Sequence, residues 1–239
     1  MGHATTLIEV DGTRLLTDPV LGARVLHIRR LGVVPDLPPR LDAILVSHAH
    51  YDHLDLPSLR ALAAEVPVVA PHDVARLIER RTGHGTIAVA PGDSVRVGNV
   101  DVVATRAVHD GSRMRWTQDL GAVGFVIAGS ARVYFAGDTD VFDGMSLLAE
   151  RIDVALLPVW GWGPHVGPGH LDPEGAAKAA ALLAPRMAIP IHWGTLASPR
   201  VWWRDDPDLP AREFERLVAV HAPGVAVRIL APGAAMPIP

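Results

Sequence analysis

The amino-acid sequence predicts an α/β fold in which β-sheets pack on each other and helices cover their outer faces. Strand-rich segments with interspersed helices occur in two successive sets along the chain, a pattern typical of layered α/β domains. Apolar residues make up 49% of the 239 residues, which is enough for a sizeable core. Because we find no internal repeat, low-complexity tract or linker, we predict a single domain over residues 1–239.

The first set of elements opens with two strands joined by Asp11-Gly12, a pair that suits the positive φ angles of a hairpin turn. A long connection follows at residues 21–40, and its apolar side chains indicate that it packs over the body, where it can serve as a lid. Asp55 can cap a helix that carries Pro57 in its first turn. We expect strands at 5–10, 14–18, 43–47 and 66–70, helices at 56–64 and 73–81, strands within 86–108, and a hairpin of 121–128 with 132–136.

The second set alternates helices and strands more regularly. Asp172 and Pro173 form a strong start signal for an alanine-rich helix, as the cap and the first helical residue. We expect helices at 145–151, 173–183 and 211–221, and strands at 154–159, 187–191 and 225–230.

Composition narrows the functional classes. The formal net charge of −4 argues against a general nucleic-acid binder, which usually has a surplus of basic residues. The absence of cysteine excludes disulfides and thiolate metal sites, and leaves histidine and carboxylate as metal ligands. The N-terminal residues do not resemble a secretory signal, and no apolar run reaches the roughly 18 residues of a membrane span. We therefore expect a cytoplasmic protein; its oligomeric state stays open.

Three histidines and an aspartate are concentrated in one short loop. His48, His50, Asp52 and His53 directly follow an apolar, β-branched run that reads as a buried strand. Imidazole and carboxylate at this density suit a borderline divalent ion such as zinc. A histidine-rich loop can also lie on the protein surface without binding a metal, but the strand before it and the helix start after it favour a metal site.

Three further strands also run straight into a possible ligand. Strands ending near residues 108, 137 and 191 lead to His109, Asp138 and His192. Side chains at the ends of neighbouring strands can converge on one edge of a sheet sandwich, where rigid elements hold them. One such residue alone is weak evidence, but four strands with the same pattern predict a metal centre.

The ordered residues His48-x-His50-x-Asp52-His53, His109, Asp138 in Ala-Gly-Asp-Thr, and His192 resemble the ligand set of the metallo-β-lactamase superfamily. The resemblance spans nearly the full chain and implies a four-layer αββα sandwich with a dinuclear metal centre at one edge. The closest branch contains ascorbate-6-phosphate lactonase and N-acylphosphatidylethanolamine phospholipase D. The residues that resemble this branch are Gly2-His3-Ala-Thr, Leu16-Thr-Asp-Pro, His170-Leu-Asp-Pro-Glu-Gly-Ala and Ile191-His-Trp-Gly-Thr. Related chains usually have several residues before Gly-His, so the first strand is either shortened here or trimmed.

The resemblance assigns a role to each ligand. It implies that His48, His50 and His109 bind a first metal, that Asp52, His53 and His192 bind a second, and that Asp138 bridges them. Asp18, at the end of the second predicted strand, matches an aspartate near the site; we interpret it as the hydrogen-bond partner of a ligand, although it can equally be a turn residue before Pro19. Zinc suits these ligands best, and manganese or iron is also acceptable.

A dinuclear centre of this kind predicts a hydrolase. Two divalent ions that share a water lower its pKa from about 15.7 towards 7, which gives a bridging hydroxide for attack on a phosphoester, as in a phosphodiesterase, or on a lactone. Asp52 could orient this hydroxide, and His170 is the candidate acid or substrate contact, with a capping or packing role as its alternative. A thioesterase or β-lactam-like amide hydrolase is the runner-up. The non-enzyme alternative is a metal-binding sensor or interaction protein on the same fold.

Substrate contacts are harder to predict than metal ligands. We name Trp160 and Arg113 as candidates, because tryptophans occur in loops near ligand-bearing strands and Arg113 and Arg115 follow His109. Each can instead be gap-filling or solvated surface. The partner expected is a small-molecule ester or phosphoester. The tryptophans are Trp116, Trp160, Trp162, Trp193, Trp202 and Trp203. The histidines expected to be structural or exposed are His3, His27, His72, His84, His165 and His221, of which only His3 has a case through the Gly-His-Ala-Thr resemblance.

Overall fold

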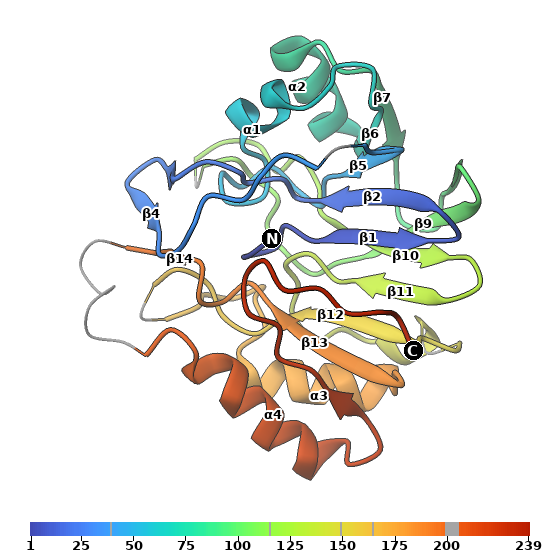
Figure 1. Ribbon diagram of the computed structural model, residues 1–239, viewed down its shortest axis with the longest axis vertical. Coiled ribbons are helices and arrows are strands. Elements are labelled where there is room, and N and C mark those ends of the chain that lie inside the picture. Colours follow the sequence, from blue (N-terminus) through green and yellow to red (C-terminus); the bar gives the residue numbers. More distant parts are fainter. Residues whose placement is uncertain (39, 115, 149, 164, 199–205) are drawn as a thin grey trace.

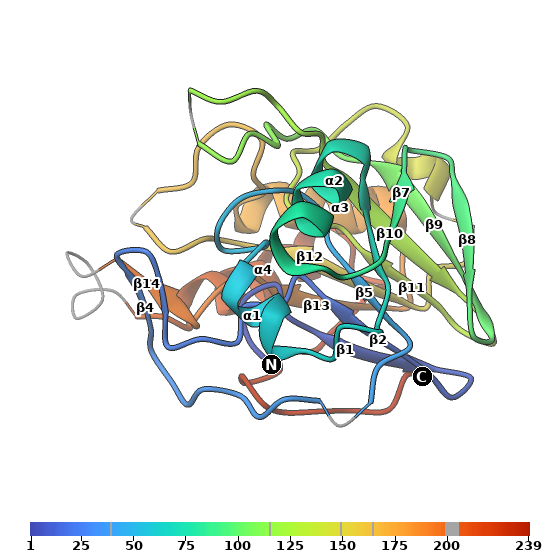
Figure 2. The same cartoon turned by 90° about the horizontal axis from the view of Figure 1, so that it is seen from above.

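The computed structural model describes residues 1–239 except 39, 115, 149, 164 and 199–205, so Arg115, Trp202 and Trp203 lie outside the described residues. The chain forms four layers (Figure 1). Helices α1 (Leu56–Ala61) and α2 (His72–Thr82) cover one sheet, and α3 (Pro173–Leu183) and α4 (Leu209–His221) cover the other. Seen from above, α1 and α2 lie in front of the strands (Figure 2). The four-layer αββα sandwich is thus confirmed.

The first sheet has five strands in the order β1-β2-β5-β6-β7. Their bounds are β1 Leu7–Val10, β2 Thr13–Thr17, β5 Ala43–Leu45, β6 Val68–Pro71 and β7 Thr86–Val89. The predicted Asp11-Gly12 hairpin is present: both residues have positive φ, +50° and +75°, and β1 pairs with β2 in antiparallel register. From β2 onward the strands of this sheet are parallel, so they end at the same edge.

The second sheet has seven strands in the order β15-β13-β12-β11-β10-β9-β8. Their bounds are β8 Ser94–Val97, β9 Val100–Arg106, β10 Val123–Ala128, β11 Arg132–Phe135, β12 Val154–Pro158, β13 Met187–Ile191 and β15 Ala226–Val227. Strands β8 to β11 are antiparallel neighbours, whereas β11, β12, β13 and β15 are parallel. The closing strand is shorter than the predicted 225–230, because this edge strand pairs with β13 over only two residues.

Three apolar cores hold the layers together. One lies between the two sheets, one between the second sheet and α3 and α4, and one between the first sheet and α1 and α2. Alternate residues of a strand serve different cores: Leu45 packs between the sheets, while Ile44 packs under the helices. Because both faces of such strands are covered, they read as continuous apolar runs in the sequence.

The helix boundaries follow the expected capping chemistry. Asp55 accepts a hydrogen bond from Ser58 N at 3.0 Å at the start of α1, and Asp172 accepts one from Gly175 N at 2.8 Å at the start of α3. Helix α1 ends at Ala61, earlier than the predicted 64. The predicted helix at 145–151 is a short 3-10 turn, η1 (Met145–Leu148), and Arg151 has a φ of +48°, which a right-handed helix does not contain.

The 21–40 connection contains a small hairpin of β3 (Arg24–Val25) and β4 (Ile28–Arg30). Strand β4 pairs with β14 (Leu196–Ala197), which forms a third, three-stranded sheet. Val20, Val25, Ile28 and Leu196 make a separate apolar cluster here, so the first part of the connection packs over the body as its apolar content predicted.

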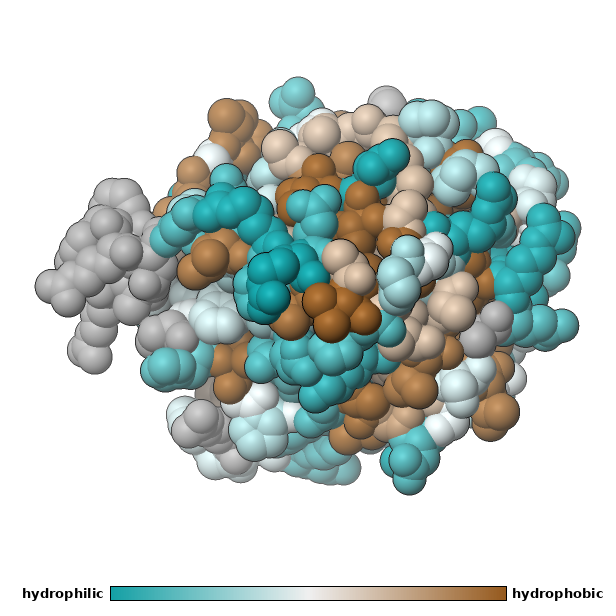
Figure 3. Space-filling view, turned by 90° about the horizontal axis from the view of Figure 1, so that it is seen from below, coloured by the Kyte–Doolittle hydropathy of each residue, from teal (hydrophilic) through white to brown (hydrophobic). Residues whose placement is uncertain are grey.

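Two further observations concern the surface. Seen from below, the surface mixes hydrophilic and hydrophobic residues, with neither kind covering the whole face (Figure 3). Among the described residues, no helix is both long enough and apolar enough to cross a membrane.

Candidate metal centre

The strand ends that carry candidate ligands meet at one edge of the sandwich. His48 follows β5 of the first sheet, while His109, Asp138 and His192 follow β9, β11 and β13 of the second. Strands β9, β11 and β13 run in the same direction, so their carboxyl ends lie together. A hydrogen bond from Val123 N to Ser47 O, 3.0 Å long, joins the two sheets beside His48.

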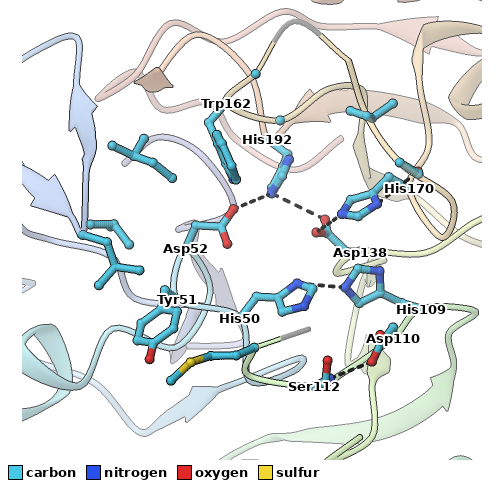
Figure 4. Close-up of a pocket in the computed structure, with 18 of the residues that line it drawn as sticks. His50, Tyr51, Asp52, His109, Asp110, Ser112, Asp138, Trp162, His170 and His192 are labelled. Atoms are coloured by element: carbon cyan, nitrogen blue, oxygen red, sulfur yellow. Dashed lines mark hydrogen bonds and ion pairs between the residues drawn. The ribbon is translucent and has the colours of Figure 1, made fainter. Parts of the chain in front are cut away.

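A first cluster contains His48, His50, His109 and Asp138. One possible ligand atom from each of these residues lies within 4.8 Å of the others. His109 Nε2 is 3.1 Å from His50 Nδ1, and His48 Nε2 is 3.9 Å from Asp138 Oδ2. Figure 4 shows His50 and His109 pointing toward each other. The structure thus brings together the three histidines assigned to the first metal.

A second cluster adjoins the first. Asp52, His53 and His192 group together with His3 within the same 4.8 Å limit. His53 Nε2 is 2.9 Å from His192 Nε2. The carboxylate of Asp138 reaches this cluster as well, with Oδ2 at 3.1 Å from His53 Nε2 and Oδ1 at 3.5 Å from His192 Nε2. Asp138 therefore lies between the two clusters, at the position expected for a bridging ligand.

On three of these histidines, Nδ1 donates a hydrogen bond, so in the neutral ring Nε2 carries no proton. His53 Nδ1 donates to Asp18 Oδ2 at 2.7 Å, and His109 Nδ1 donates to the Gly169 carbonyl at 2.7 Å. His192 Nδ1 donates to the Trp160 carbonyl at 2.6 Å. Because each acceptor fixes the proton on Nδ1, the Nε2 lone pair points into the cluster, which is the arrangement of metal-binding histidines.

Asp18 follows β2 and is hydrogen-bonded to the candidate ligand His53. Its side chain is fully buried, and Oδ1 accepts a hydrogen bond from Ser47 N at 2.7 Å. Oδ2 accepts from both Ser47 Oγ, at 2.6 Å, and His53. The carboxylate thereby connects the end of β2 to the loop at residues 47–53, which carries four of the candidate ligands and is called the ligand loop below.

The donor set fits divalent metal ions. His48 Nε2 and Asp138 Oδ1 are buried and have no hydrogen-bond partner among the described residues, although unpaired buried polar atoms are costly. Burial, followed by the charge of His53, holds the pKa of His48 well below its ordinary value, and burial lowers the pKa of His50 to about 4. Burial alone would raise the pKa of Asp138, but His192 and His53 hold it well below its ordinary value. Burial alone would lower the pKa values of His53 and His192, but the Asp138 carboxylate raises both above their ordinary value. Because neutral imidazole and ionised carboxylate are the forms that bind metal, these two rings release a proton when a metal binds.

Gly137 allows the backbone before Asp138 to pass close to Ser47 in the ligand loop. Its φ is +61°, and an added Cβ would lie 2.7 Å from Ser47 Cβ, so the residue before Asp138 touches the residue before His48. We expect Gly137→Ala to lower the free energy of unfolding by about 2–5 kcal/mol, through backbone strain and overpacking, as measured by chemical denaturation. Gly92→Ala is the control, since Gly92 has a φ of +99° and no atom within 4 Å. Equal losses in the two variants would contradict the steric explanation.

Five residues of the two clusters line a cavity of about 550 Å³, namely His50, Asp52, His109, Asp138 and His192. His170 lines it too, with Nε2 3.4 Å from Asp138 Oδ2 (Figure 4). Arg113 lines it but is engaged with the ligand loop: Nη1 donates to the carbonyls of Ala49, at 2.8 Å, and Leu54, at 3.1 Å. The apolar part of the wall consists of Val25, Leu26, Ile28, Met114, Trp162, Val166 and Pro168.

The structure does not place the Trp160 side chain in this cavity, contrary to the predicted substrate contact. The indole Nε1 of Trp160 donates to the Gly163 carbonyl, and Trp162 lines the cavity instead. The two residues lie in an irregular loop, where the sequence does not determine which side chain turns inward.

His3, which we expected to be a structural or exposed histidine, lies beside the two clusters. Its side chain is completely buried, and Nε2 lies 3.0 Å from Asp52 Oδ2. Its ring lies against that of His192, with 3.8 Å between the centroids. The only signal in the sequence was the Gly-His-Ala-Thr resemblance, because nothing in the local pattern links residue 3 to residues 52 and 192.

Comparisons with known proteins agree with the fold and with a metal-dependent hydrolase. A family model described as "Beta-lactamase superfamily domain" matches residues 13–193. A protein of Deinococcus radiodurans named UPF0173 metal-dependent hydrolase is 35% identical over 236 residues, covering 98% of this chain and 95% of that protein. A metal-dependent hydrolase of Pyrococcus furiosus is 36% identical over 240 residues, with coverage of 98% and 95%.

A solved structure, described as a novel metallo hydrolase from Ignicoccus hospitalis, is similar in fold. Its TM-score is 0.73 and its sequence is 24% identical, over 98% of this chain and 94% of that one. From the matching family model and these relatives, we conclude that the chain belongs to the metallo-β-lactamase superfamily.

Proposed function

We propose that this metal-dependent hydrolase holds two divalent ions and cleaves an ester bond, either a phosphoester or a lactone. The position of Asp138 carries the proposal: its two carboxylate oxygens face ligand atoms of both clusters at the wall of one cavity. His48, His50 and His109 would hold one ion, and Asp52, His53 and His192 the other. When bound, such ions supply Lewis acidity and make water a nucleophile at neutral pH.

Two side chains would act beside the reacting bond: Asp52 would orient the attacking water, and His170 would donate a proton. Burial alone would raise the pKa of Asp52, but its hydrogen bonds with His192 and His3 hold it well below its ordinary value, so the carboxylate is ionised and can orient the attacking water. His170 is partly exposed to the cavity, at 24% of its side chain. Its Nδ1 donates to the Gly167 and Pro168 carbonyls at 3.2 Å, so the doubly protonated ring is the form whose Nε2–H would pass a proton to the leaving oxygen and leave the neutral ring.

The choice of ester bond rests on the sequence resemblance to the lactonase and phospholipase D branch. The names of the relatives support metal-dependent hydrolysis. Imidazole and carboxylate donors without thiolate favour zinc as the first metal to test, with manganese and iron as the alternatives.

A panel of substrates tests the proposal. We expect zinc-loaded protein to hydrolyse bis(p-nitrophenyl) phosphate or a γ-lactone, at a rate that rises with metal occupancy and disappears after chelation. A thioester and a β-lactam in the same assay cover the runner-up reactions. Turnover of only these two would replace the ester proposal. Stoichiometric metal binding with no turnover of any of the four would favour a sensor or interaction protein.

A further inference from the structure

His3 contacts two candidate ligands that come from different sheets. Its Nε2 lies 3.0 Å from Asp52 Oδ2, and because a carboxylate only accepts, the imidazole N–H donates this hydrogen bond. Asp52 lies on the loop that follows β5 of the first sheet, whereas His192 follows β13 of the second. The single ring of His3 therefore lies against ligands from both halves of the sandwich.

The backbone of His3 also holds His192 in place. His192 N donates to the His3 carbonyl at 2.9 Å, while His3 N donates to Thr195 Oγ1 at 2.7 Å. His192 has a φ of +66°, a conformation that a residue with a side chain adopts only with support from its surroundings. His3 thus supplies a hydrogen bond at the residue where the ligand leaves regular strand geometry.

These contacts fall on one cluster. The rings adjacent to His3 are those of His192, at 3.8 Å, and His53, at 5.7 Å, and both residues belong to the group with Asp52. The other cluster has its own supports, since Ser47 Oγ contacts His48 Nδ1 at 2.9 Å and the Gly169 carbonyl holds His109.

His84 shows what a histidine with a purely structural role looks like in this fold. It is also buried, and its two ring nitrogens pair with the carbonyls of Val66, at 3.0 Å, and Leu59, at 2.8 Å. His3 differs, because its Nδ1 is buried without a hydrogen-bond partner among the described residues. Within the part of the chain that the structure describes, its one side-chain hydrogen bond is the bond to Asp52, so packing alone does not account for a polar ring at this position.

We propose that His3 is a positioning residue that fixes Asp52 and His192 and thereby sets the metal affinity of the Asp52–His53–His192 position, leaving the His48–His50–His109 position unchanged. The proposal rests on the two-metal arrangement proposed above. In this proposal, the N-terminal segment forms hydrogen bonds to ligands of one ion only. Loss of such a partner typically weakens metal binding 10- to 100-fold.

The test is a zinc titration in competition with a chromophoric chelator, together with metal analysis of the purified protein. We expect wild type to bind two ions, and His3→Leu to weaken one of them about 10- to 100-fold while the other changes less than about twofold. His3→Gln, whose amide can place an N–H where Nε2 stands, should recover most of the lost affinity. His3→Asn, with a shorter amide, should not. His84→Gln is the matched control and should retain both affinities even if its melting temperature falls.

Each alternative gives a different pattern. Equal weakening of both ions in His3→Leu, or no weakening, would overturn the proposal; if that variant does not fold, the comparison of Gln with Asn decides. Failure of Gln to rescue would identify His3 as a direct metal ligand instead. Wild-type protein that binds a single ion would overturn the two-metal arrangement and this proposal together. Two ions without hydrolysis of any substrate would overturn the proposed function alone.

Discussion

Asp138→Ala is expected to abolish hydrolysis and to remove tightly bound metal. The carboxylate of Asp138 lies between the two clusters, and it is the negative group nearest to His53 Nε2, at 3.1 Å. Without it, three buried and two partly buried histidines would face one another with much less negative charge to attract a cation. We expect His50→Ala to act in the same direction, because it removes one ligand of the first cluster. Metal analysis and the rate of ester hydrolysis would be measured on the same preparation.

The control for this substitution lies two residues away. Asp140 is exposed, and its Oδ1 accepts a hydrogen bond from Val141 N at 2.8 Å. Asp140→Ala should keep full metal content and activity, which separates the loss of a ligand from a general disturbance of this loop. If Asp138→Ala retained both metals and normal turnover, the proposed mechanism would be wrong.

Asp18→Asn is expected to weaken metal binding about 10- to 100-fold, although it changes only one atom of a buried side chain. Ser47 N–H requires an acceptor, so the amide oxygen of the new residue would face Ser47 and its NH₂ group would face His53 Nδ1. His53 would then have to accept at Nδ1 and carry its proton on Nε2. That proton would block the nitrogen that faces His192 and Asp138.

The same substitution at Asp153 provides a matched control. Asp153 is buried and accepts a hydrogen bond from Arg132 N at 2.8 Å, but it precedes β12 and so lies at the opposite end of the strands from the ligands. Asp153→Asn should alter stability alone. Metal affinity by competitive titration and NMR of the His53 ring nitrogens would test the tautomer change. Unaltered zinc affinity in Asp18→Asn would show that the Asp18–His53 hydrogen bond does not determine ligation.

The layers and the meeting of the candidate ligands could be predicted from the sequence because they depend on local patterns. When a histidine or aspartate follows a buried strand within three residues, its side chain lies at the edge of the sheet where that strand ends. His48, His109, Asp138 and His192 all follow that rule. The capping residues Asp55 and Asp172 are equally local, so the starts of α1 and α3 were predictable to the residue.

Features that depend on distant pairing were not predictable in this way. Strand β4 pairs with β14, which lies more than 160 residues later, and no local pattern in the sequence predicts this pairing. His3 reaches the centre through contacts with residues 52 and 192. Trp160 and Trp162 differ by two positions in an irregular loop, where side-chain direction follows from tertiary contacts. Such information lies in the assembled structure rather than in any short stretch of sequence.

The hydrogen bond from Val123 N to Ser47 O joins the two sheets where both candidate clusters lie, yet the two clusters are completed by residues at different points of the chain. Each cluster takes its possible ligands from elements of both sheets, so neither sheet alone contains a complete cluster. During synthesis, the cluster around Asp52 is incomplete until β13 and His192 have emerged and docked on the other half. The cluster of His48, His50, His109 and Asp138 is complete once residue 138 has been synthesised, so the two clusters would become available to metal at different stages of synthesis.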